Sequence, residues 1–297
     1  MSPFDPGDVS RGVAIVTGSS SIHSNSHKNG SGVAMAIVNN FGVRIHYKVE
    51  GDGPPITLMH GMGGSIENWV NAGYVAALKD ELRLILIDSR GFGESDKPHD
   101  PGSYTREAKV SDVIAVLDDL GIERAHYWGY SMGASNGWAM GMLRPDRLLS
   151  LVLGGYPALP SPTSLRNRVK WESRALLMRL GMEVYIAAME MDRGPMPEDN
   201  KKRLMANDPE AYAAQQIANI DWGTPEAEVR AMTVRALVYS GTEDDYPLPD
   251  NHEMAKRSAS LAPKATFLPL PGYDHMKAFQ DSAAVIPYVR EFLASIN

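Results

Sequence analysis

Short apolar runs alternate with amphipathic segments over most of the chain. From Met35 the pattern opens with AIVNN and VRIHYKVEG, which predict a two-stranded antiparallel ribbon turned at Phe41-Gly42. Later apolar runs, each bounded by turn residues, predict buried strands at 56–59, 82–87, 125–128, 149–153, 234–239 and 266–268. The pattern therefore predicts an α/β fold, with a mostly parallel sheet flanked by helices and a ligand crevice at the carboxyl ends of the strands.

The alternation breaks between residues 157 and 230, where no strand-like run occurs and apolar residues fall in helix-like stretches. We interpret this segment as a helical cap inserted into an α/β core formed by residues 35–156 and 231–297. Residues 1–34 are rich in Ser, Gly and Asn and lack sustained periodicity, which predicts a mobile N-terminal extension. The sequence does not decide whether that extension is native or derived from cloning.

Composition removes several classes of function. Hydrophobic residues make up 43% of the 297 residues and charged residues 22%, a balance that excludes wholesale disorder. The 29 Lys and Arg against 36 Asp and Glu give a net charge of −7, and no dense basic run is present, so nucleic-acid binding is not expected. The chain has no cysteine, which excludes disulfides, thiolate nucleophiles and Cys-ligated metals.

Targeting and cofactor signals are weak. No apolar run approaches the roughly 18 residues that a membrane span needs, and the opening MSPFDPGD is acidic where a signal peptide is basic. These features predict a cytoplasmic protein, monomeric or homodimeric, with no membrane span. The stretch from Val13 to Ser21 looks like the start of a short-chain dehydrogenase cofactor site, but the further glycines and the following helix are missing. We expect neither a cofactor nor a metal.

The strongest local motif is GYSMG, from Gly129 to Gly133, between a predicted strand and a helix-like stretch. In a tight strand-to-helix turn the flanking glycines leave room for the backbone, and the serine hydroxyl stands out over the sheet. Ser131 is therefore the predicted nucleophile. The N–H of Met132, at the start of the helix, is predicted to stabilise an oxyanion.

A serine nucleophile needs a base and an acid. Of the eight histidines, His275 alone follows a predicted strand in a flexible loop, PGYDH, that can overhang the crevice. The strand before GTEDDYP brings two candidate acids, and we favour Asp244 over Asp245, with Glu243 as an outsider. The other histidines are expected at the surface (His23, His27, His46, His99), packed in a strand (His126), at the start of a helix without zinc spacing (His252), or in a turn (His60).

A second oxyanion donor is expected from the glycine-rich turn after the strand at 56–59. In HGMGG the glycines allow the backbone to turn its amides inward, so the N–H of Met62 is the predicted donor. His60 of the same turn is predicted to hold the turn in shape rather than to act as a base.

These motifs together resemble the α/β-hydrolase superfamily, and a serine carboxylesterase-like member of it, over residues 35–297. HGMGG, DSRGFGESD, GYSMG, GTEDD and GYDH occur in the order and approximate spacing of that family. The resemblance implies acyl transfer through a covalent intermediate on Ser131, and DSRGFGESD as a structural loop near the site. A serine in place of an aspartate nucleophile argues against the family's dehalogenases and epoxide hydrolases.

The interpretation we favour is a carboxylesterase for small to medium esters, with a small-molecule ester as its partner. Lactonase, carbon–carbon bond hydrolase, perhydrolase and acyltransferase share the same three residues, because substrate choice depends on the pocket and the cap. A ligand-binding receptor on a hydrolase scaffold is an alternative of another class.

Overall fold

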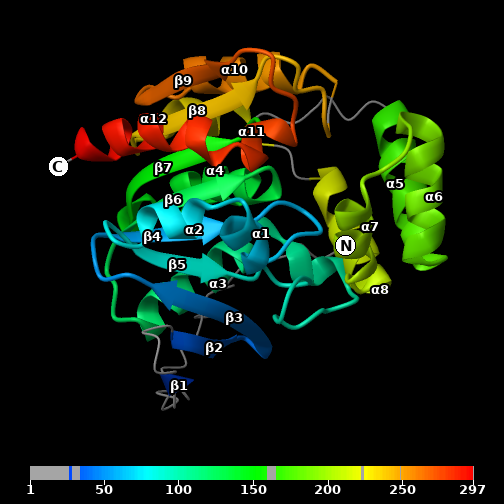
Figure 1. The fold of residues 1–297 in the computed structure, drawn as a ribbon, viewed down its shortest axis with the longest axis horizontal. Coiled ribbons are helices and arrows are strands. Elements are labelled where there is room, and N and C mark those ends of the chain that lie inside the picture. Colours follow the sequence, from blue (N-terminus) through cyan, green and yellow to red (C-terminus); the bar gives the residue numbers. More distant parts are fainter. Residues whose placement is uncertain (1–26, 29–33, 159–164, 222–223, 248, 297) are drawn as a thin grey trace, which may run out of the picture.

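A computed structural model of the chain describes residues 27–28, 34–158, 165–221, 224–247 and 249–296. Its centre is a nine-stranded sheet in the order β1-β2-β3-β5-β4-β6-β7-β8-β9 (Figure 1). The first three pairs, β1–β2, β2–β3 and β3–β5, are antiparallel. The strands from β5 through β4, β6, β7 and β8 to β9 are parallel to one another. The strands are β1 (His27–Lys28), β2 (Ala34–Asn40), β3 (Val43–Glu50), β4 (Pro55–Met59), β5 (Arg83–Ile87), β6 (Ala125–Tyr130), β7 (Leu148–Gly154), β8 (Ala236–Gly241) and β9 (Ala265–Leu270).

The predicted α/β fold and mostly parallel sheet are confirmed. The antiparallel ribbon is β2 and β3, which turn at Phe41 and Gly42 with φ of 49° and 86°. Both values lie in the left-handed region, which a two-residue hairpin turn requires.

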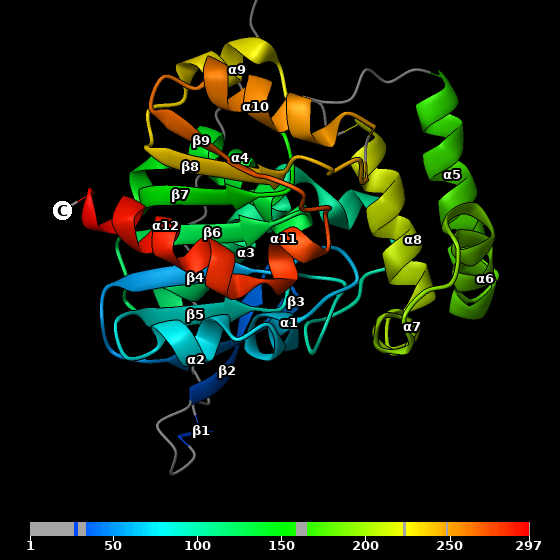
Figure 2. The same ribbon diagram turned by 45° about the horizontal axis from the view of Figure 1, so that its top comes forward.

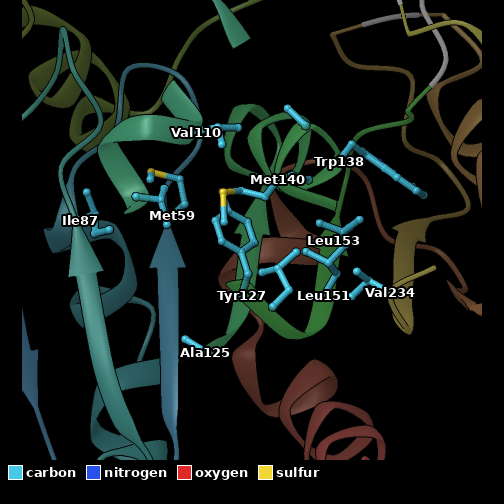
Figure 3. Packing of buried hydrophobic residues seen from close by; sticks show 14 of the residues in the cluster. Met59, Ile87, Val110, Ala125, Tyr127, Trp138, Met140, Leu151, Leu153 and Val234 are labelled. Carbon is cyan, nitrogen blue, oxygen red and sulfur yellow. The ribbon is translucent and has the colours of Figure 1, made fainter. Parts of the chain in front are cut away.

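Helices cover both faces of the sheet. One face packs against α3 (Arg106–Asp119), α4 (Met132–Leu143), α9 (Glu226–Ala231) and α10 (Asn251–Leu261). Figure 3 shows part of this core, in which Tyr127 and Leu153 of the sheet face α4. The other face packs against α1 (Ile66–Asn71), α2 (Tyr74–Leu78), α11 (Lys277–Gln280) and α12 (Ser282–Ala294). The sheet is therefore buried on both sides, which explains why its strands read as continuous apolar runs.

The order of the strands creates a crevice between β4 and β6. From β4 the chain crosses one face to β5, whereas from β6 it crosses the other face to β7 on the opposite side. Connections that diverge in this way leave an opening at the carboxyl ends of the two strands. The turn at 60–64 follows β4 and Ser131 follows β6, so both lie at this opening.

Four helices stand apart from the sheet: α5 (Leu165–Arg179), α6 (Met182–Arg193), α7 (Glu198–Met205) and α8 (Pro209–Ala218). We call them the cap helices. They lie on the right in Figures 1 and 2, on the side opposite the C-terminus. A separate apolar cluster that includes Met178, Tyr185 and Tyr212 joins them to Phe92 and Met132 of the sheet side. α9 packs instead on α4 and α10, so the division of the chain at residue 230 stays a prediction.

Three short 3-10 helices complete the described chain, at Pro101–Tyr104, Pro145–Arg147 and Asn219–Asp221. Most of the expected extension at 1–34, including the dehydrogenase-like stretch at 13–21, lies outside the described residues; within it, His27–Lys28 pairs with β2. Within the described ranges, no helix is long and apolar enough to cross a membrane, and no group of three or more potential ligand side chains could hold a metal ion.

Candidate active site

Ser131 occupies a strained turn between β6 and α4. Its φ of 55° and ψ of −115° are unusual for a residue with a side chain, and such strain is found mainly at functional sites. The flanking glycines are required by contact: a Cβ on Gly129 would lie 2.2 Å from the Gly133 carbonyl oxygen, and one on Gly133 would lie 2.1 Å from the Met59 oxygen. The local sequence thus allows the sharp turn that presents the hydroxyl.

The structure brings together the three side chains that were predicted from distant parts of the chain. His275 Nε2 lies 3.0 Å from Ser131 Oγ, and His275 Nδ1 lies 3.1 Å from each carboxylate oxygen of Asp244. All three residues are buried, with exposed fractions of 9% or less. In this arrangement the carboxylate fixes Nδ1 as the protonated nitrogen, which leaves Nε2 free to take the serine proton.

The two candidate acids have different surroundings. Asp244 is 3% exposed, and its Oδ1 also accepts a hydrogen bond of 3.2 Å from the Tyr246 N–H. Asp245 is exposed at the wall of a cavity, and Glu243 is exposed as well. Only Asp244 of the three lies within hydrogen-bond distance of His275 among the described contacts.

The loop that carries His275 is held by β6 itself. The Tyr130 hydroxyl donates a hydrogen bond of 2.5 Å to the His275 carbonyl oxygen. The imidazole also contacts the rings of Tyr130 and Tyr246, with centroid distances of 5.3 and 5.2 Å. The residue that precedes the nucleophile therefore also helps to position the base.

The turn after β4 leaves a backbone amide beside the cavity without a hydrogen-bond partner among the described residues. The Gly61 carbonyl accepts hydrogen bonds from His60 Nδ1 at 2.7 Å and from the Gly64 N–H at 3.1 Å. In a trans peptide the N–H points away from the carbonyl, so the Met62 N–H is held facing the other way. Neither this N–H nor that of Met132 donates a hydrogen bond to any of the described residues, and both are available to an oxyanion.

His60 has the structural environment that was predicted for it. It is fully buried, and its Nε2 accepts a hydrogen bond of 3.1 Å from the Ser89 N–H, so Nδ1 carries the proton that it donates to Gly61. Burial lowers the pKa of His60, which keeps the ring neutral, so that one ring nitrogen can accept a hydrogen bond while the other donates one.

His46 was expected at the surface, and this is wrong. Its Nδ1 lies 2.8 Å from Asp88 Oδ2, and only 15% of the side chain is exposed. Asp88 also accepts hydrogen bonds from the N–H groups of Ile66 and Glu94 and so joins α1 to the loop at 89–95. Burial acts to raise the pKa of Asp88, but the hydrogen bond to His46 and those from the two N–H groups hold it below its usual value. The sequence did not reveal this pair, because a histidine in the middle of an edge ribbon has no distinctive spacing.

A cavity of about 300 Å³ lies between the site and the cap helices. Its lining combines Ser131, His275 and Met62 with residues of the cap helices and the segment between α6 and α7, among them Tyr185, Met189, Met196, Arg193, Arg203 and Tyr212. Met189 and Met196 thus face the cavity, whereas Met178 and Met182 are buried among apolar side chains.

Comparisons with known proteins agree with the fold. Residues 54–171 match the alpha/beta hydrolase fold family. The chain is 30% identical over 205 residues to the provisionally named carbamate hydrolase RutD of Caulobacter sp. (strain K31), which covers 68% of this chain and 70% of that protein. This chain belongs to the α/β-hydrolase fold family. Within the family it is a hydrolase.

Other relatives of this α/β hydrolase carry different names. The crystal structure of the enol-lactonase from Burkholderia xenovorans LB400 matches with a TM-score of 0.73 and 29% identity, over 88% of this chain and 99% of that one. A Bacillus subtilis (strain 168) protein provisionally named 2-succinyl-6-hydroxy-2,4-cyclohexadiene-1-carboxylate synthase is 25% identical over 85% of this chain and 96% of its own length. Relatives named for a carbamate, a lactone and a synthase reaction do not define one substrate.

Proposed function

We propose that this α/β hydrolase cleaves small to medium carboxylic esters through an acyl-enzyme intermediate, with Ser131 as nucleophile, His275 as base and Asp244 as the acid that orients it. The observation that carries the proposal is the unbroken chain of hydrogen-bond distances, 3.0 Å from Ser131 to His275 and 3.1 Å from His275 to Asp244. These separations lie within the range required between a nucleophile, its base and the group that orients the base.

The reaction follows from the geometry. Ser131 Oγ attacks the ester carbonyl while His275 Nε2 takes its proton, and the Asp244 carboxylate stabilises the resulting imidazolium. The imidazolium then gives the proton to the departing alcohol, which leaves the acyl group on Ser131. A water molecule, deprotonated by the same nitrogen, releases the acid and restores the serine.

The N–H groups of Met62 and Met132 are the proposed oxyanion donors. They come from turns at the ends of the neighbouring strands β4 and β6, and Gly61 lies so close to the nucleophile that a Cβ on it would be 3.3 Å from Ser131 Cβ. This closeness of the two turns supports a position for both amides beside the hydroxyl. Because their peptides are fixed before substrate binds, they stabilise the developing charge without reorganisation.

A lactone is the second candidate substrate, since it is an ester closed into a ring. The similarity to the enol-lactonase, at 29% identity over nearly the whole of that structure, supports it. The triad chemistry is the same, and the cavity of about 300 Å³ suits a compact ring as well as a short chain. A lactone and a linear ester of equal carbon number, compared by kcat/KM, distinguish the two candidates.

The test is Ser131→Ala, assayed with p-nitrophenyl esters of increasing acyl length. Loss of a serine nucleophile typically lowers kcat by about 10⁴- to 10⁶-fold, and the wild type is expected to prefer short acyl chains. Ser135→Ala is the matched control, because Ser135 lies one turn further along α4 and only its N–H contacts the Ser131 carbonyl. If Ser131→Ala turned over esters as fast as the wild type, Ser131 would not be the nucleophile, and the proposed reaction would be refuted with it.

A further inference from the structure

Two arginines of the cap helices line the cavity. Arg203 of α7 donates a hydrogen bond of 2.9 Å from Nη1 to the Gly63 carbonyl oxygen, which places it beside the oxyanion turn. Arg193, at the end of α6, stacks over the Tyr246 ring with its guanidinium carbon 4.8 Å from the centroid. Arg203 thus contacts the oxyanion turn, and Arg193 contacts the tyrosine whose ring packs on His275.

A third arginine lies behind this wall. Arg174 of α5 is only 7% exposed, with its guanidinium carbon 5.5 Å from the centre of the Trp171 ring. Burial and the nearby Tyr246 hydroxyl raise the pKa of Tyr185, and the charges of Arg174, Arg193 and Arg203 all oppose that rise. The three positive charges are thus all near the Tyr185 hydroxyl in the cavity wall.

Among the described residues, a single ion pair involves these three arginines. Within the described ranges, the nearest ion-pair partner of any of the three is Asp192, whose carboxylate is 3.8 Å from Arg193. Two carboxylates line the cavity, but Asp245 and Asp274 adjoin Asp244 and His275 on the sheet side, and Asp274 accepts a hydrogen bond of 2.7 Å from the Lys277 N–H. Arg203 is half-buried and lines the cavity without an ion-pair partner among the described residues, so its charge points to an anion that arrives with the ligand.

We propose that the cap end of the cavity is a carboxylate-binding subsite, formed by Arg203 and Arg193, and that the substrate is an ester or lactone bearing a carboxylate a few bonds from its reacting carbonyl. This inference rests on the proposed function. The planar guanidinium of Arg203 matches a carboxylate, and only one of its nitrogens is engaged by Gly63 among the described contacts.

The separation between Arg203 and the Met62 N–H limits the length of the substrate. Arg203 bonds to Gly63, the residue directly after Met62, whose N–H would hold the oxyanion. A carboxylate on Arg203 and a carbonyl at Met62 are therefore ends of a short chain, as in a half-ester of a four- to six-carbon diacid. The cavity of about 300 Å³ is large enough for such a molecule.

The test compares two substrates of nearly equal shape, monomethyl glutarate and its neutral analogue methyl 4-carbamoylbutanoate. The wild type is expected to have a kcat/KM at least tenfold higher for the anion. Arg203→Gln should lower the anion-to-neutral ratio by about ten- to a hundredfold, the range of a lost charge-assisted hydrogen bond. Arg193→Gln, in a more exposed residue, should lower the ratio less and keeps the test valid if the first variant folds poorly.

Arg179→Gln is the matched control. Arg179 is another arginine of the cap helices, at the end of α5, but its side chain is 43% exposed and pairs with Glu210 at 3.4 Å. Arg179→Gln should leave the anion-to-neutral ratio of kcat/KM unchanged. Equal kcat/KM for both esters in the wild type, or an unchanged ratio in both Arg203→Gln and Arg193→Gln, would overturn the subsite while leaving the esterase intact.

If neither these two esters nor the p-nitrophenyl esters are hydrolysed, the proposed function fails, and the subsite is then tested alone. Calorimetry of glutarate with Ser131→Ala should give millimolar or tighter binding, weakened at least tenfold when Arg203→Gln is added. Absence of glutarate binding, or binding that Arg203→Gln leaves unchanged, would contradict the subsite.

Discussion

The two walls of the cavity are built on different principles. On the sheet wall, Ser131, His275 and Asp244 come from the ends of strands and form one closed set of hydrogen bonds. On the cap wall, the contributing residues come mainly from helices, and Arg203 has no ion-pair partner among the described residues. The polar groups of the sheet wall bond to one another, whereas the cap wall has hydrogen-bond donors that remain available to a ligand.

This difference separates reaction from recognition. Strand ends within a sheet buried on both faces are rigid, so they hold reacting groups to within the tolerance that catalysis requires. The cap helices expose large apolar side chains, with Leu176 at 59%, Leu180 at 63% and Met191 at 90%, and depend on a smaller core. Substitutions in the sheet wall should therefore change the rate of any substrate, and those in the cap wall should change which substrate is used.

The largest effect is expected from Asp244→Asn. The amide cannot hold the imidazole in the required tautomer or stabilise its charged form, and kcat should fall by about 10⁴-fold. Asp245→Asn, one residue away and exposed, should change kcat by less than about threefold, since an exposed charge contributes little. Ester turnover under saturating substrate measures both variants.

A larger loss in Asp245→Asn than in Asp244→Asn would exchange the roles of the two residues. Equal small losses would mean that His275 needs no acid, and the sheet wall would then be less complete than its hydrogen bonds indicate.

A smaller but clear contrast is expected in stability. Leu58→Ala removes a fully buried side chain of β4, which should lower the free energy of unfolding by about 3 kcal/mol because a cavity remains. Leu176→Ala, at a cap position that is 59% exposed, should change it by less than about 0.5 kcal/mol. Urea unfolding of both variants tests this, and similar losses would show that Leu176 is covered in solution.

The sheet wall could be predicted from the sequence because its determinants are local. The strand expected at 125–128 is Ala125–Tyr130, and the one expected at 234–239 is Ala236–Gly241, so the errors are about two residues at the ends. Gly129 is required by a contact with Gly133 in the same turn, and Gly133 by a contact with the end of β4. Asp244 and His275 could be selected because each follows a strand whose carboxyl end must reach the same edge.

The cap wall could not be predicted in this way. Helical spacing shows that α5 and α6 are amphipathic, but it does not say that Arg174 is buried or that Arg203 reaches Gly63. Those facts depend on how helices pack on one another and on the sheet, which no short-range pattern records. His46 was misplaced for the same reason, since its partner Asp88 is 42 residues away.

The smallest of these effects concerns acid stability and belongs to the sheet. His126 of β6 is 4% exposed, and its Nδ1 lies 2.7 Å from Ser150 Oγ on β7. Burial lowers the pKa of His126 to about 4, below the usual 6.5 that applies when the chain is unfolded. Protonation therefore favours unfolding: the stability that the neutral ring contributes is complete above pH 6.5 and is lost as the pH falls from 6.5 through 4.

His126→Gln removes this titration while keeping a side chain that can bond to Ser150. Between pH 7 and pH 4.5 the wild type should lose more free energy of unfolding than the variant, by on the order of 2 kcal/mol. Urea unfolding at the two pH values gives the difference directly, and the other buried groups, which titrate in both proteins, cancel in it. If both proteins lose the same amount, the β6–β7 contact opens to water before the histidine is protonated. The sheet would then be less rigid at this point than the contrast with the cap requires.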